Sequence, residues 1–299
     1  MKRLATIVSI TRANFLPLTL VIVFAGLAAA YYSQHMFNAV DGLLVLVGSV
    51  LTHASVNAFN NYFDYRSGID RKTEKLPFSG GVEVLVKGAM STSSAFLVAL
   101  LSLIGAGLIG VYFLTRFFAV LLPIMLYGLF VIVLYTPVLA RVHAVSEIVA
   151  GTGFGLMGVG VYATQTGIVS GPAIAVFVPV TILVALLLFL NEFPDAEVDR
   201  EAGRRHLVIL LGRKKAAWLY VAGLAATYIS IVLAVLIGYA PSLVLIALVT
   251  TPIAYKAGRI ALNNYDRTSA LIPAQGSNVL VILTTILLIG VGYAVAALV

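Results

Sequence analysis

The sequence predicts an all-α, polytopic membrane protein with about nine transmembrane helices in one bundle. Of its 299 residues, 61% are hydrophobic and only 10% are charged, which is too apolar for a chain built around one soluble core. Several uninterrupted apolar stretches approach the roughly 20 residues that a helix needs to cross a bilayer. Stretches such as "AIAVFVPVTILVALLLFL" lack the alternation of barrel strands, so helices are the expected spanning elements.

Other features of the composition narrow the class of protein. There are no cysteines, which excludes disulfides and thiolate metal sites. The basic start, "MKRLATIVSITRANFLPLTL", has no small-residue cleavage site after an apolar region of suitable length, so we expect a retained first span. The net charge of +7 is better explained by basic loops on the cytoplasmic face than by nucleic-acid binding.

The apolar stretches, taken in order, predict the topology of the chain. All but one of the 19 Lys and Arg residues fall in alternate connections, the exception being Arg116. By the positive-inside rule, this pattern predicts a multi-pass protein of the cell membrane with a cytoplasmic N-terminus and an outside C-terminus. We expect a single domain over residues 1–299, made of two four-helix halves (about 15–135 and 146–255) and a last helix. The nine expected spans are 15–31, 42–63, 94–114, 117–135, 146–164, 172–190, 216–237, 241–255 and 278–298.

Polar oxygen-bearing residues follow the second expected span, in "NNYFDYRSGID". On a continuing helix, Asn60 and Asp64 lie four positions apart and share one face. Ser67 and Gly68 then form a helix stop, so Asp70 can fold back toward the first two side chains. This segment therefore predicts a small cluster of hard oxygen ligands at one membrane boundary.

A second cluster of the same kind follows the sixth expected span, in "NEFPDAEVDREAGRRH". Asn191, Asp195 and Asp199 again recur every four positions, and an offset of four spans returns them to the same side of the membrane. Carboxylate and amide oxygens are the ligands that Mg²⁺ prefers, usually together with substrate phosphates. The two clusters predict a metal–phosphate site on the cytoplasmic side.

Basic residues accompany both clusters and would clamp a diphosphate beside the metal. The alternative for any single residue is that acids and amides cap helices while bases set the topology. Because only 10% of the residues are charged, the presence of two matched clusters favours the metal–phosphate site. The candidate diphosphate-binding residues are Arg66, Arg71, Lys72, Lys75, Arg204 and Arg205 beside the clusters, together with Arg141, the only base in its connection.

The two segments resemble the aspartate-rich motifs of the UbiA superfamily of membrane prenyltransferases. The long "YFDYRSGID" spacing and "LYTPVLARVHAVSEIVAGTGFGLMGVGVYATQTG" are most similar to the branch that prenylates 1,4-dihydroxy-2-naphthoate for menaquinone. The resemblance implies a Mg²⁺-dependent enzyme in which Asp64, Asp195 and Asp199 are catalytic and two ions bridge the diphosphate. It also implies that Arg12, which stands where relatives have a basic residue before the first span, is a further candidate for binding the diphosphate. Asn61 departs from the pattern, because the superfamily commonly has Asp there, and we leave it out of the ligand set.

The resemblance also implies how the reaction proceeds. Diphosphate departure leaves an allylic cation that an electron-rich aromatic ring attacks, in a bundle that excludes water. Glu147 and Tyr135 are candidates for binding the acceptor or taking its proton, His206 for facing phosphate, and His53 for hydrogen-bonded packing. Aromatic residues expected near the cation are Phe59, Tyr62, Phe63, Tyr135, Phe189 and Phe193.

The expected partners are a prenyl diphosphate, an aromatic acceptor and membrane lipid, with no nucleic acid and no obligatory protein partner. One alternative within the superfamily is geranylgeranyl transfer to a glycerol phosphate ether, as in archaeal-type lipid synthesis, which needs the same metal–diphosphate chemistry. A more distant alternative is a membrane transporter, whose site would lie near the midplane between inverted repeats. The acids here lie at one membrane edge instead.

Overall fold

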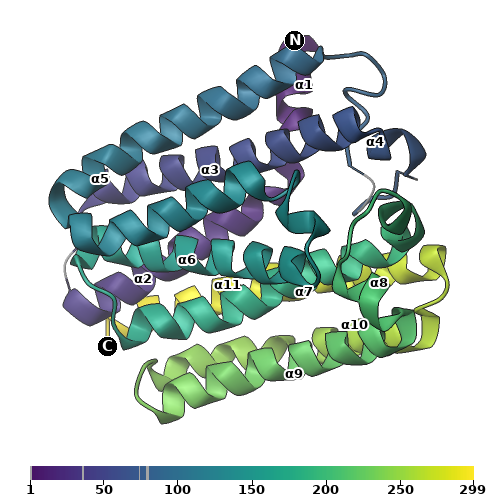
Figure 1. The fold of residues 1–299 in the computed structure, drawn as a ribbon. Coiled ribbons are helices and arrows are strands. Elements are labelled where there is room, and N and C mark those ends of the chain that lie inside the picture. Colours follow the sequence, from purple (N-terminus) through teal and green to yellow (C-terminus); the bar gives the residue numbers. More distant parts are fainter. Residues whose placement is uncertain (1, 36, 74, 79–80) are drawn as a thin grey trace.

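The computed structural model describes residues 2–35, 37–73, 75–78 and 81–299 (Figure 1). No strand occurs among them, which confirms the all-α class. In order, the elements are α1 Lys2–Ile10, η1 Ala13–Phe15, α2 Pro17–Gln34, α3 Ala39–Ser67, α4 Ile69–Lys72, α5 Thr92–Leu134, η2 Leu139–Arg141, α6 Val145–Thr166, α7 Gly171–Glu201, α8 Leu207–Leu211, α9 Arg213–Leu236, η3 Ser242–Thr250, α10 Thr251–Asn264 and α11 Thr268–Ala296.

The sequence predicts nine spans, whereas the described residues contain eight helical segments long and apolar enough to cross a membrane. The difference lies in α5, whose 43 residues contain a break at Phe117, where φ is −133° and ψ is 45°. A Cβ placed on Gly110 would lie only 2.1 Å from Met125 Cε. A straight helix would separate these residues by about 22 Å. The helix therefore doubles back, as Figure 1 shows, and one segment supplies two expected spans.

Several helices extend past their expected ends. The predicted end of the eighth span, at residue 255, is wrong, because the helical segment formed by η3 and α10 continues from Ser242 to Asn264. Lys256 and Arg259 consequently lie on the exposed side of a helix and not in a connection. Long basic side chains tolerate this position because their stems lie along apolar surface while the charge reaches toward water. The helices α3 and α7 also continue through both polar motifs.

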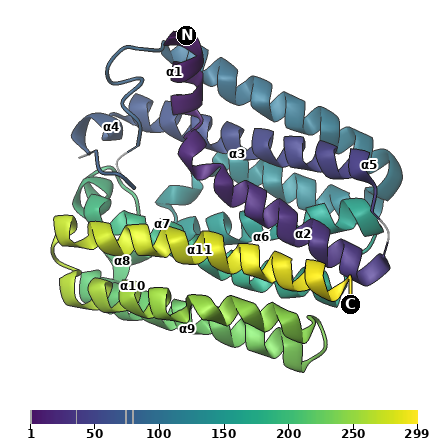
Figure 2. The same ribbon diagram turned by 180° about the vertical axis from the view of Figure 1, so that it is seen from behind.

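The spanning helices form a closed succession of neighbours. In chain order, α3, α5, α6, α7, α9, α10 and α11 each contact the next, and α2 contacts both α11 and α3. Figure 2 shows α2 and α11 crossing the face opposite that of Figure 1. The two termini lie at opposite ends of the bundle, as an odd number of crossings requires.

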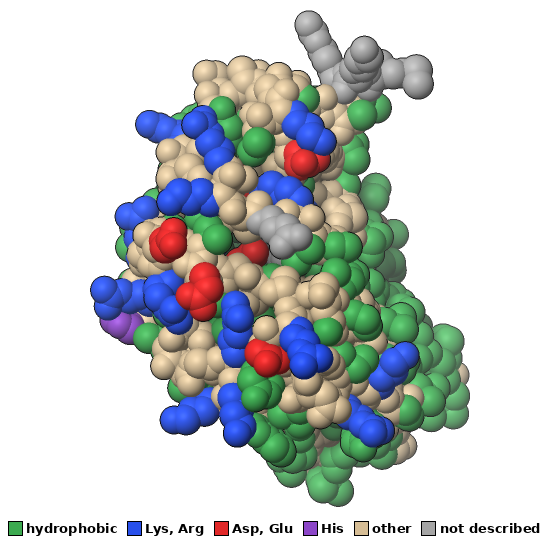
Figure 3. Space-filling view, turned by 90° about the vertical axis from the view of Figure 1, so that its right-hand side faces the viewer, with side chains coloured by type: hydrophobic (Ala, Val, Ile, Leu, Met, Phe, Trp, Pro, Cys, Tyr) green, Lys and Arg blue, Asp and Glu red, His purple; other side chains and the backbone are tan. Residues whose placement is uncertain are grey.

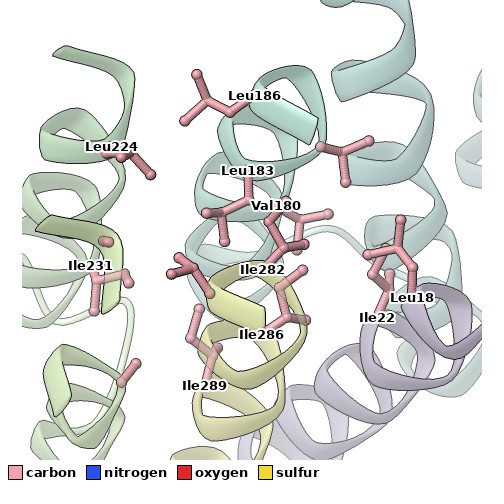
Figure 4. Close-up of a cluster of buried hydrophobic side chains, with 14 of the residues drawn as sticks. Leu18, Ile22, Val180, Leu183, Leu186, Leu224, Ile231, Ile282, Ile286 and Ile289 are labelled. Atoms are coloured by element: carbon pink, nitrogen blue, oxygen red, sulfur yellow. The ribbon is translucent and has the colours of Figure 1, made fainter. Parts of the chain in front are cut away.

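The largest core cluster joins α2, α7, α9 and α11, whose branched aliphatic side chains meet in Figure 4. Helices in lipid associate through close packing more than through apolar burial, so small residues are needed at their contacts. Gly151 and Gly155 of α6 meet this need against α7. An added Cβ would lie 2.4 Å from the Thr181 carbonyl oxygen at Gly151 and 2.1 Å from Thr181 Oγ1 at Gly155. Only glycine allows this approach.

Charge is concentrated at one end of the bundle. Figure 3 looks at that end, where Lys and Arg side chains are spread across the surface with acidic side chains between them. Arg116, the exception in the sequence pattern, lies at the α5 reversal and forms an ion pair with the buried Asp41. Tyr112 Oη donates a 2.8 Å hydrogen bond to the same carboxylate. The base at this reversal is thus neutralised by a partner at the start of α3.

Candidate functional site

A cavity of about 270 Å³ lies where α3 and α7 end, and we call it the polar cavity. Its walls come from the segment before α2 and from α3, α5, α6, α7 and the turn that precedes α8. The cavity brings together residues from both sequence motifs. Among its lining residues are Arg12, Asn60, Asp64, Asp70, Tyr135, Asn191, Glu192, Asp195, Asp199, Arg204 and His206.

Each motif helix ends at a glycine with positive φ, and the next residues return toward the cavity. Gly68 (φ 81°) ends α3, and its N–H donates to the Tyr65 carbonyl oxygen. Gly203 (φ 83°) follows α7, and the Arg204 N–H then donates to the Asp199 carbonyl oxygen at 2.9 Å. Left-handed residues after helices are typically glycine because no Cβ is strained. The turns bring Asp70 and Arg204 back to the helix ends that they follow.

Arg204 joins the two motifs. Its Nη2 donates a short hydrogen bond to Asp64 Oδ1 on α3, and its Nη1 lies 3.3 Å from Asp199 Oδ1 on α7. Asp64 Oδ2 also accepts a 3.0 Å bond from Asn60 Nδ2. Burial by itself would lower the pKa of Arg204, but the carboxylates of Asp64 and Asp199 outweigh it and raise that pKa. The guanidinium is therefore held charged between two buried acids.

Arg12 is fixed on the other side of Asn60 by amide oxygens. It donates through Nε and Nη2 to Asn61 Oδ1 at 3.2 and 2.8 Å, and through Nη2 to Asn60 Oδ1 at 3.0 Å. Asn61 is fully buried and donates in turn to the carbonyl oxygens of Ile10 and Asn57. Asn61 is absent from the ligand set expected from the sequence, yet its side chain holds Arg12 at the cavity wall.

Three buried oxygens of residues that line this cavity accept no hydrogen bond from any described residue. They are Asp70 Oδ2, Asn191 Oδ1 and Glu192 Oε2. Lys75 contacts the other Asp70 oxygen at 3.3 Å. Burial, followed by the negative charge of Asp64, raises the pKa of Asp70 even though Lys75 and Arg12 oppose the shift. Unsatisfied buried oxygens in an oxygen-only set fit a hard divalent cation such as Mg²⁺.

Most of the basic residues expected at the site do not line the cavity. Arg66 donates to Tyr62 Oη at 2.9 Å, and Arg71 lies over the Tyr65 ring. Lys72 lies 3.7 Å from Glu201 on the surface. Arg205 Nη1 lies 2.9 Å from His143 Nε2, and Arg141 is exposed. Within the described part of the chain, Arg12 and Arg204 are the bases of the cavity wall, with Lys75 behind Asp70.

The aromatic residues of the cavity also differ from the expected set. Tyr135 is the one member of that set in the described wall, which otherwise has Phe15, Phe78 and Phe154. Burial, followed by the charge of Glu192, raises the pKa of Tyr135 well above its usual range, so its hydroxyl stays protonated. The remaining expected residues pack against one another or in the core, namely Phe59, Tyr62, Phe63, Phe189 and Phe193.

His53 lies in the wall as a packed residue, as the sequence analysis expects. Its Nδ1 is 2.7 Å from Thr19 Oγ1, and its ring meets the Phe154 ring edge-on at 4.8 Å. Because α2 carries Thr19 and α6 carries Phe154, this side chain links three helices beneath the acids.

A further group of two acids and a histidine adjoins the motif residues, and its members Glu192 and His206 also line the cavity. Glu147, Glu192 and His206 are all buried, and their ligand atoms lie within 4.8 Å of one another. Glu147 Oε1 accepts the backbone N–H of Leu207 and Oε2 accepts the Ser146 hydroxyl, both at 2.7 Å. Its carboxylate therefore holds the start of α8. His206 Nε2 lies 3.3 Å from Asp199 Oδ2, so this ring faces acids.

Part of the segment between α4 and α5 borders the cavity. Phe78 and Gly81 are both in its wall. Gly81 has a φ of 70°, and a Cβ there would lie 2.5 Å from Asp70 Oδ1. The Phe78 ring would lie 3.5 Å from a Cβ on Gly276, so it reaches α11. Gly81 therefore lies against Asp70 of the first motif, and Phe78 lies against the last helix.

Some of these residues carry a signal in the sequence and others do not. Asn61 and Glu192 each sit beside a motif asparagine, so adjacency could have suggested them. Phe15, Phe78 and Phe154 lie outside both motifs, and no periodicity distinguishes them from ordinary apolar positions. Their presence at the cavity depends on how distant helices pack.

The sequence of this chain is similar to those of known proteins. The profile of the UbiA prenyltransferase family matches residues 19–279. A 1,4-dihydroxy-2-naphthoate octaprenyltransferase of Bacillus subtilis (strain 168) is 29% identical over 249 residues, which cover 81% of this chain and 78% of that protein. The enzyme of the same description from Haemophilus influenzae is 28% identical over 220 residues, 68% of either chain.

Solved structures share the fold at lower identity. A UbiA homologue from Aeropyrum pernix K1 matches with a TM-score of 0.72 and 19% identity, covering 93% of this chain and 97% of that one. A UbiA homologue from Archaeoglobus fulgidus bound to DMAPP and Mg²⁺ matches with a TM-score of 0.66 and 16% identity, covering 97% and 99%. A structure described for digeranylgeranylglyceryl phosphate synthase matches with a TM-score of 0.67 and 17% identity, covering 98% and 99%.

The amide of Asn61 provides a test of how the Arg12 side chain is held. Replacing Asn61 by Leu removes two hydrogen bonds from a buried guanidinium at similar volume, so we expect the free energy of unfolding to fall by about 1–3 kcal/mol. Thermal unfolding in detergent measures the change. Asn61→Asp keeps an acceptor facing Arg12 but loses the donors to the Ile10 and Asn57 carbonyl oxygens, so its stability should lie between those of the Leu variant and the parent. Equal stability of the Leu variant and the parent would contradict this role.

Proposed function

This chain belongs to the UbiA prenyltransferase family, and we propose that it transfers a prenyl group from a prenyl diphosphate to an aromatic quinone precursor. The observation that carries the proposal is that Asn and Asp residues of both motifs line one cavity, whose other walls are apolar. A diphosphate with a hydrocarbon tail would place its charged head at the Asn and Asp residues and its tail at the apolar walls. The family match covers the helices that supply both motifs.

We propose that Asn60, Asp64, Asp70, Asn191, Asp195 and Asp199 hold Mg²⁺, and that two ions bind. The buried oxygens of Asp70 and Asn191 support this assignment, as does the bound DMAPP and Mg²⁺ in the Archaeoglobus fulgidus homologue. When bound, Mg²⁺ would neutralise the charge of the diphosphate and so favour its departure.

The residues of this chain would act on the diphosphate from two sides. Arg12 donates to Asn60 and Arg204 donates to Asp64, and these N–H groups can donate to phosphate oxygens in place of the present acceptors. Charge-assisted bonds of this kind strengthen as negative charge develops on the leaving group. The C–O bond breaks with both electrons on the diphosphate, while Arg66, Arg71, Lys72, Lys75, Arg141 and Arg205 attract the anion at the rim.

The allylic carbon must then meet the acceptor ring before it meets water. Phe78 and Phe154 supply ring faces in the wall, and Tyr135 contributes a protonated hydroxyl that can donate to the acceptor. The ring carbon forms the new C–C bond and afterwards loses a proton. Glu147 acts indirectly in this scheme, since its carboxylate positions the segment that carries Arg204.

The acceptor is proposed to be 1,4-dihydroxy-2-naphthoate, which places the reaction in menaquinone synthesis. The two relatives at 28–29% identity carry that activity in their descriptions. The similarity to the digeranylgeranylglyceryl phosphate synthase structure concerns the fold alone, at 17% identity. Sequence relatedness therefore favours the naphthoate over a glycerol phosphate ether.

We also propose that the cavity faces the cytoplasm. Support comes from the distribution of bases, which lie at the end where α3 and α7 finish, and from the pairing of Arg116 with Asp41 at the other end.

One assay tests the reaction and separates the acceptors. Purified protein in liposomes receives a radiolabelled prenyl diphosphate with 1,4-dihydroxy-2-naphthoate, or with a glycerol phosphate ether. We expect diphosphate release and a labelled naphthoate product, both of which EDTA stops and added Mg²⁺ restores. Product from the ether alone would refute the acceptor, and turnover that persists in EDTA would refute the metal requirement.

The carboxylate of Asp195 should be essential because it is an oxygen ligand in the proposed set. We expect Asp195→Asn to lower kcat by at least about 100-fold, as for loss of a charge-stabilising group. Glu197 offers a matched control on the same helix, since its exposed carboxylate pairs with Arg200 on the surface. Glu197→Gln should keep near-parent turnover. Near-parent turnover in Asp195→Asn, with its fold intact, would contradict the assignment.

The orientation can be tested by labelling, because the chain contains no cysteine. We expect a single cysteine at Ser91, beside the charged end, to react only when the cytoplasmic face is accessible. A cysteine at Val169, between α6 and α7, should react from outside. The reverse pattern would overturn the proposed orientation.

A further inference from the structure

Glu147, Glu192 and His206 bring three elements of the bundle together, and we call these three residues the histidine group. Glu147 lies in the first turn of α6, Glu192 lies on α7, and His206 immediately precedes α8. Their exposed fractions are only 3%, 7% and 1%, so the group is shielded from bulk water. Unlike the Asn and Asp residues of the two motifs, this group contains an imidazole, and a nitrogen ligand changes which cations a site prefers.

The two carboxylates of the histidine group have no basic partner. Among the described residues, no Lys or Arg forms an ion pair with Glu147 or Glu192. The guanidinium of Arg204 is already shared between Asp64 and Asp199. Two buried carboxylates are strongly unfavourable in the ionised form unless a positive charge compensates them. A bound dication would compensate both.

The group also offers ligand atoms that nothing else engages. Glu192 Oε2 and both ring nitrogens of His206 are buried and make no hydrogen bond with a described residue. His206 Nδ1 lies 3.7 Å from Glu192 Oε2, so an unpaired nitrogen and an unpaired oxygen face each other. Buried polar atoms without partners are uncommon in folded proteins, and one explanation for them is an ion that binds there.

Neighbouring polar groups hold the ligands as they do in metal sites. A metal-binding histidine almost always donates its other ring N–H to a carboxylate, a carbonyl oxygen or water. His206 Nε2 lies 3.3 Å from Asp199 Oδ2, so a small rotation of the ring would complete such a bond. Glu147 accepts hydrogen bonds from the Leu207 N–H and the Ser146 hydroxyl, both at 2.7 Å. These bonds orient its carboxylate, and each oxygen keeps a lone pair for an ion.

We propose that Glu147, Glu192 and His206 bind a transition-metal dication such as Zn²⁺, at a site separate from the Mg²⁺ of the two motifs. Imidazole with carboxylates suits Zn²⁺, whereas Mg²⁺ prefers oxygen ligands. The ligand atoms lie within 4.8 Å of one another, and tetrahedral Zn²⁺ needs them about 3.3 Å apart, so movements of about 1 Å would close the site. Glu192 and His206 also line the polar cavity, so the fourth ligand can come from that side.

Such an ion would fasten the end of α7 to its surroundings. It would join α7 to the start of α6 and to the turn that carries Arg204, two residues before His206. A ligand that binds the folded state alone stabilises that state. Zinc should therefore raise the temperature of thermal unfolding beyond the value that Mg²⁺ alone gives.

Metal content tests the inference without reference to prenyl transfer. The full chain, purified in detergent, is stripped with EDTA, exchanged into buffer with excess Mg²⁺ and titrated with Zn²⁺. Mass spectrometry then measures the bound zinc, and zinc X-ray absorption identifies its ligands. We expect one zinc ion per chain that excess Mg²⁺ does not displace, with one imidazole among its ligands.

Variants of two ligands should weaken zinc binding. In His206→Gln and in Glu192→Gln we expect affinity for Zn²⁺ to fall at least about tenfold, since even changes to residues that only support metal ligands cost 10–100-fold. Thermal unfolding in Mg²⁺ reports whether each variant is folded. Matched controls are His143→Gln, on the surface, and Glu197→Gln, exposed on the same helix as Glu192. Both should bind zinc as the parent does, and so should Asp195→Asn.

Three outcomes would overturn the inference. The first is a parent protein that retains no zinc in excess Mg²⁺, as expected if protons alone compensate the two glutamates. The second is bound zinc without an imidazole ligand. The third is zinc that Asp195→Asn loses and His206→Gln keeps, which would assign it to the Asn and Asp set. Turnover enters none of these measurements, so the proposed function stands or fails separately.

Discussion

The contact on which the site depends is the one that Arg204 makes with acids from two distant helices. Asp64 on α3 and Asp199 on α7 are both buried, and carboxylates in such positions are strongly unfavourable without a partner. One guanidinium compensates both, and in doing so it holds the ends of α3 and α7 together. The planar fork of arginine suits this bridging, which the point charge of lysine would not reproduce.

The same arrangement gives the cavity oxygen atoms that can bind metal ions and arginine N–H groups that can bind an anion. Asp70 Oδ2 and Asn191 Oδ1 remain without a donor from the described residues, while Arg12 and Arg204 take amide and carboxylate oxygens as acceptors. A phosphate group could accept hydrogen bonds from both arginines while metal cations bind the carboxylates. Left-handed glycines at the ends of both motif helices make this arrangement possible, because each lets the chain reverse within two residues.

The bundle is packed differently on the two sides of α6. Where α6 meets α7, glycines bring backbones into contact and leave no space. Where α6 faces the folded α5, a Cβ added to Gly153 would meet only Val131 Cγ1 at 3.9 Å. The bundle thus combines charge compensation at its end with close packing on one side of α6 and open space on the other.

Sequence alone determined the features that depend on local geometry. Apolar stretches predicted the helices, four-residue spacing put Asn60 with Asp64 and Asn191 with Asp195 on common faces, and Gly68 marked a helix stop. Tertiary structure decided which residues meet across the bundle: that Arg204 bridges α3 and α7, that Asn61 holds Arg12, and that most of the expected bases do not line the cavity. It also distinguished Gly151, pressed against α7, from Gly153, which faces open space only two positions later. The reason is physical, because helix periodicity follows from backbone bonds within a few residues, whereas contacts between side chains follow from packing distances that neighbouring residues in the sequence do not set.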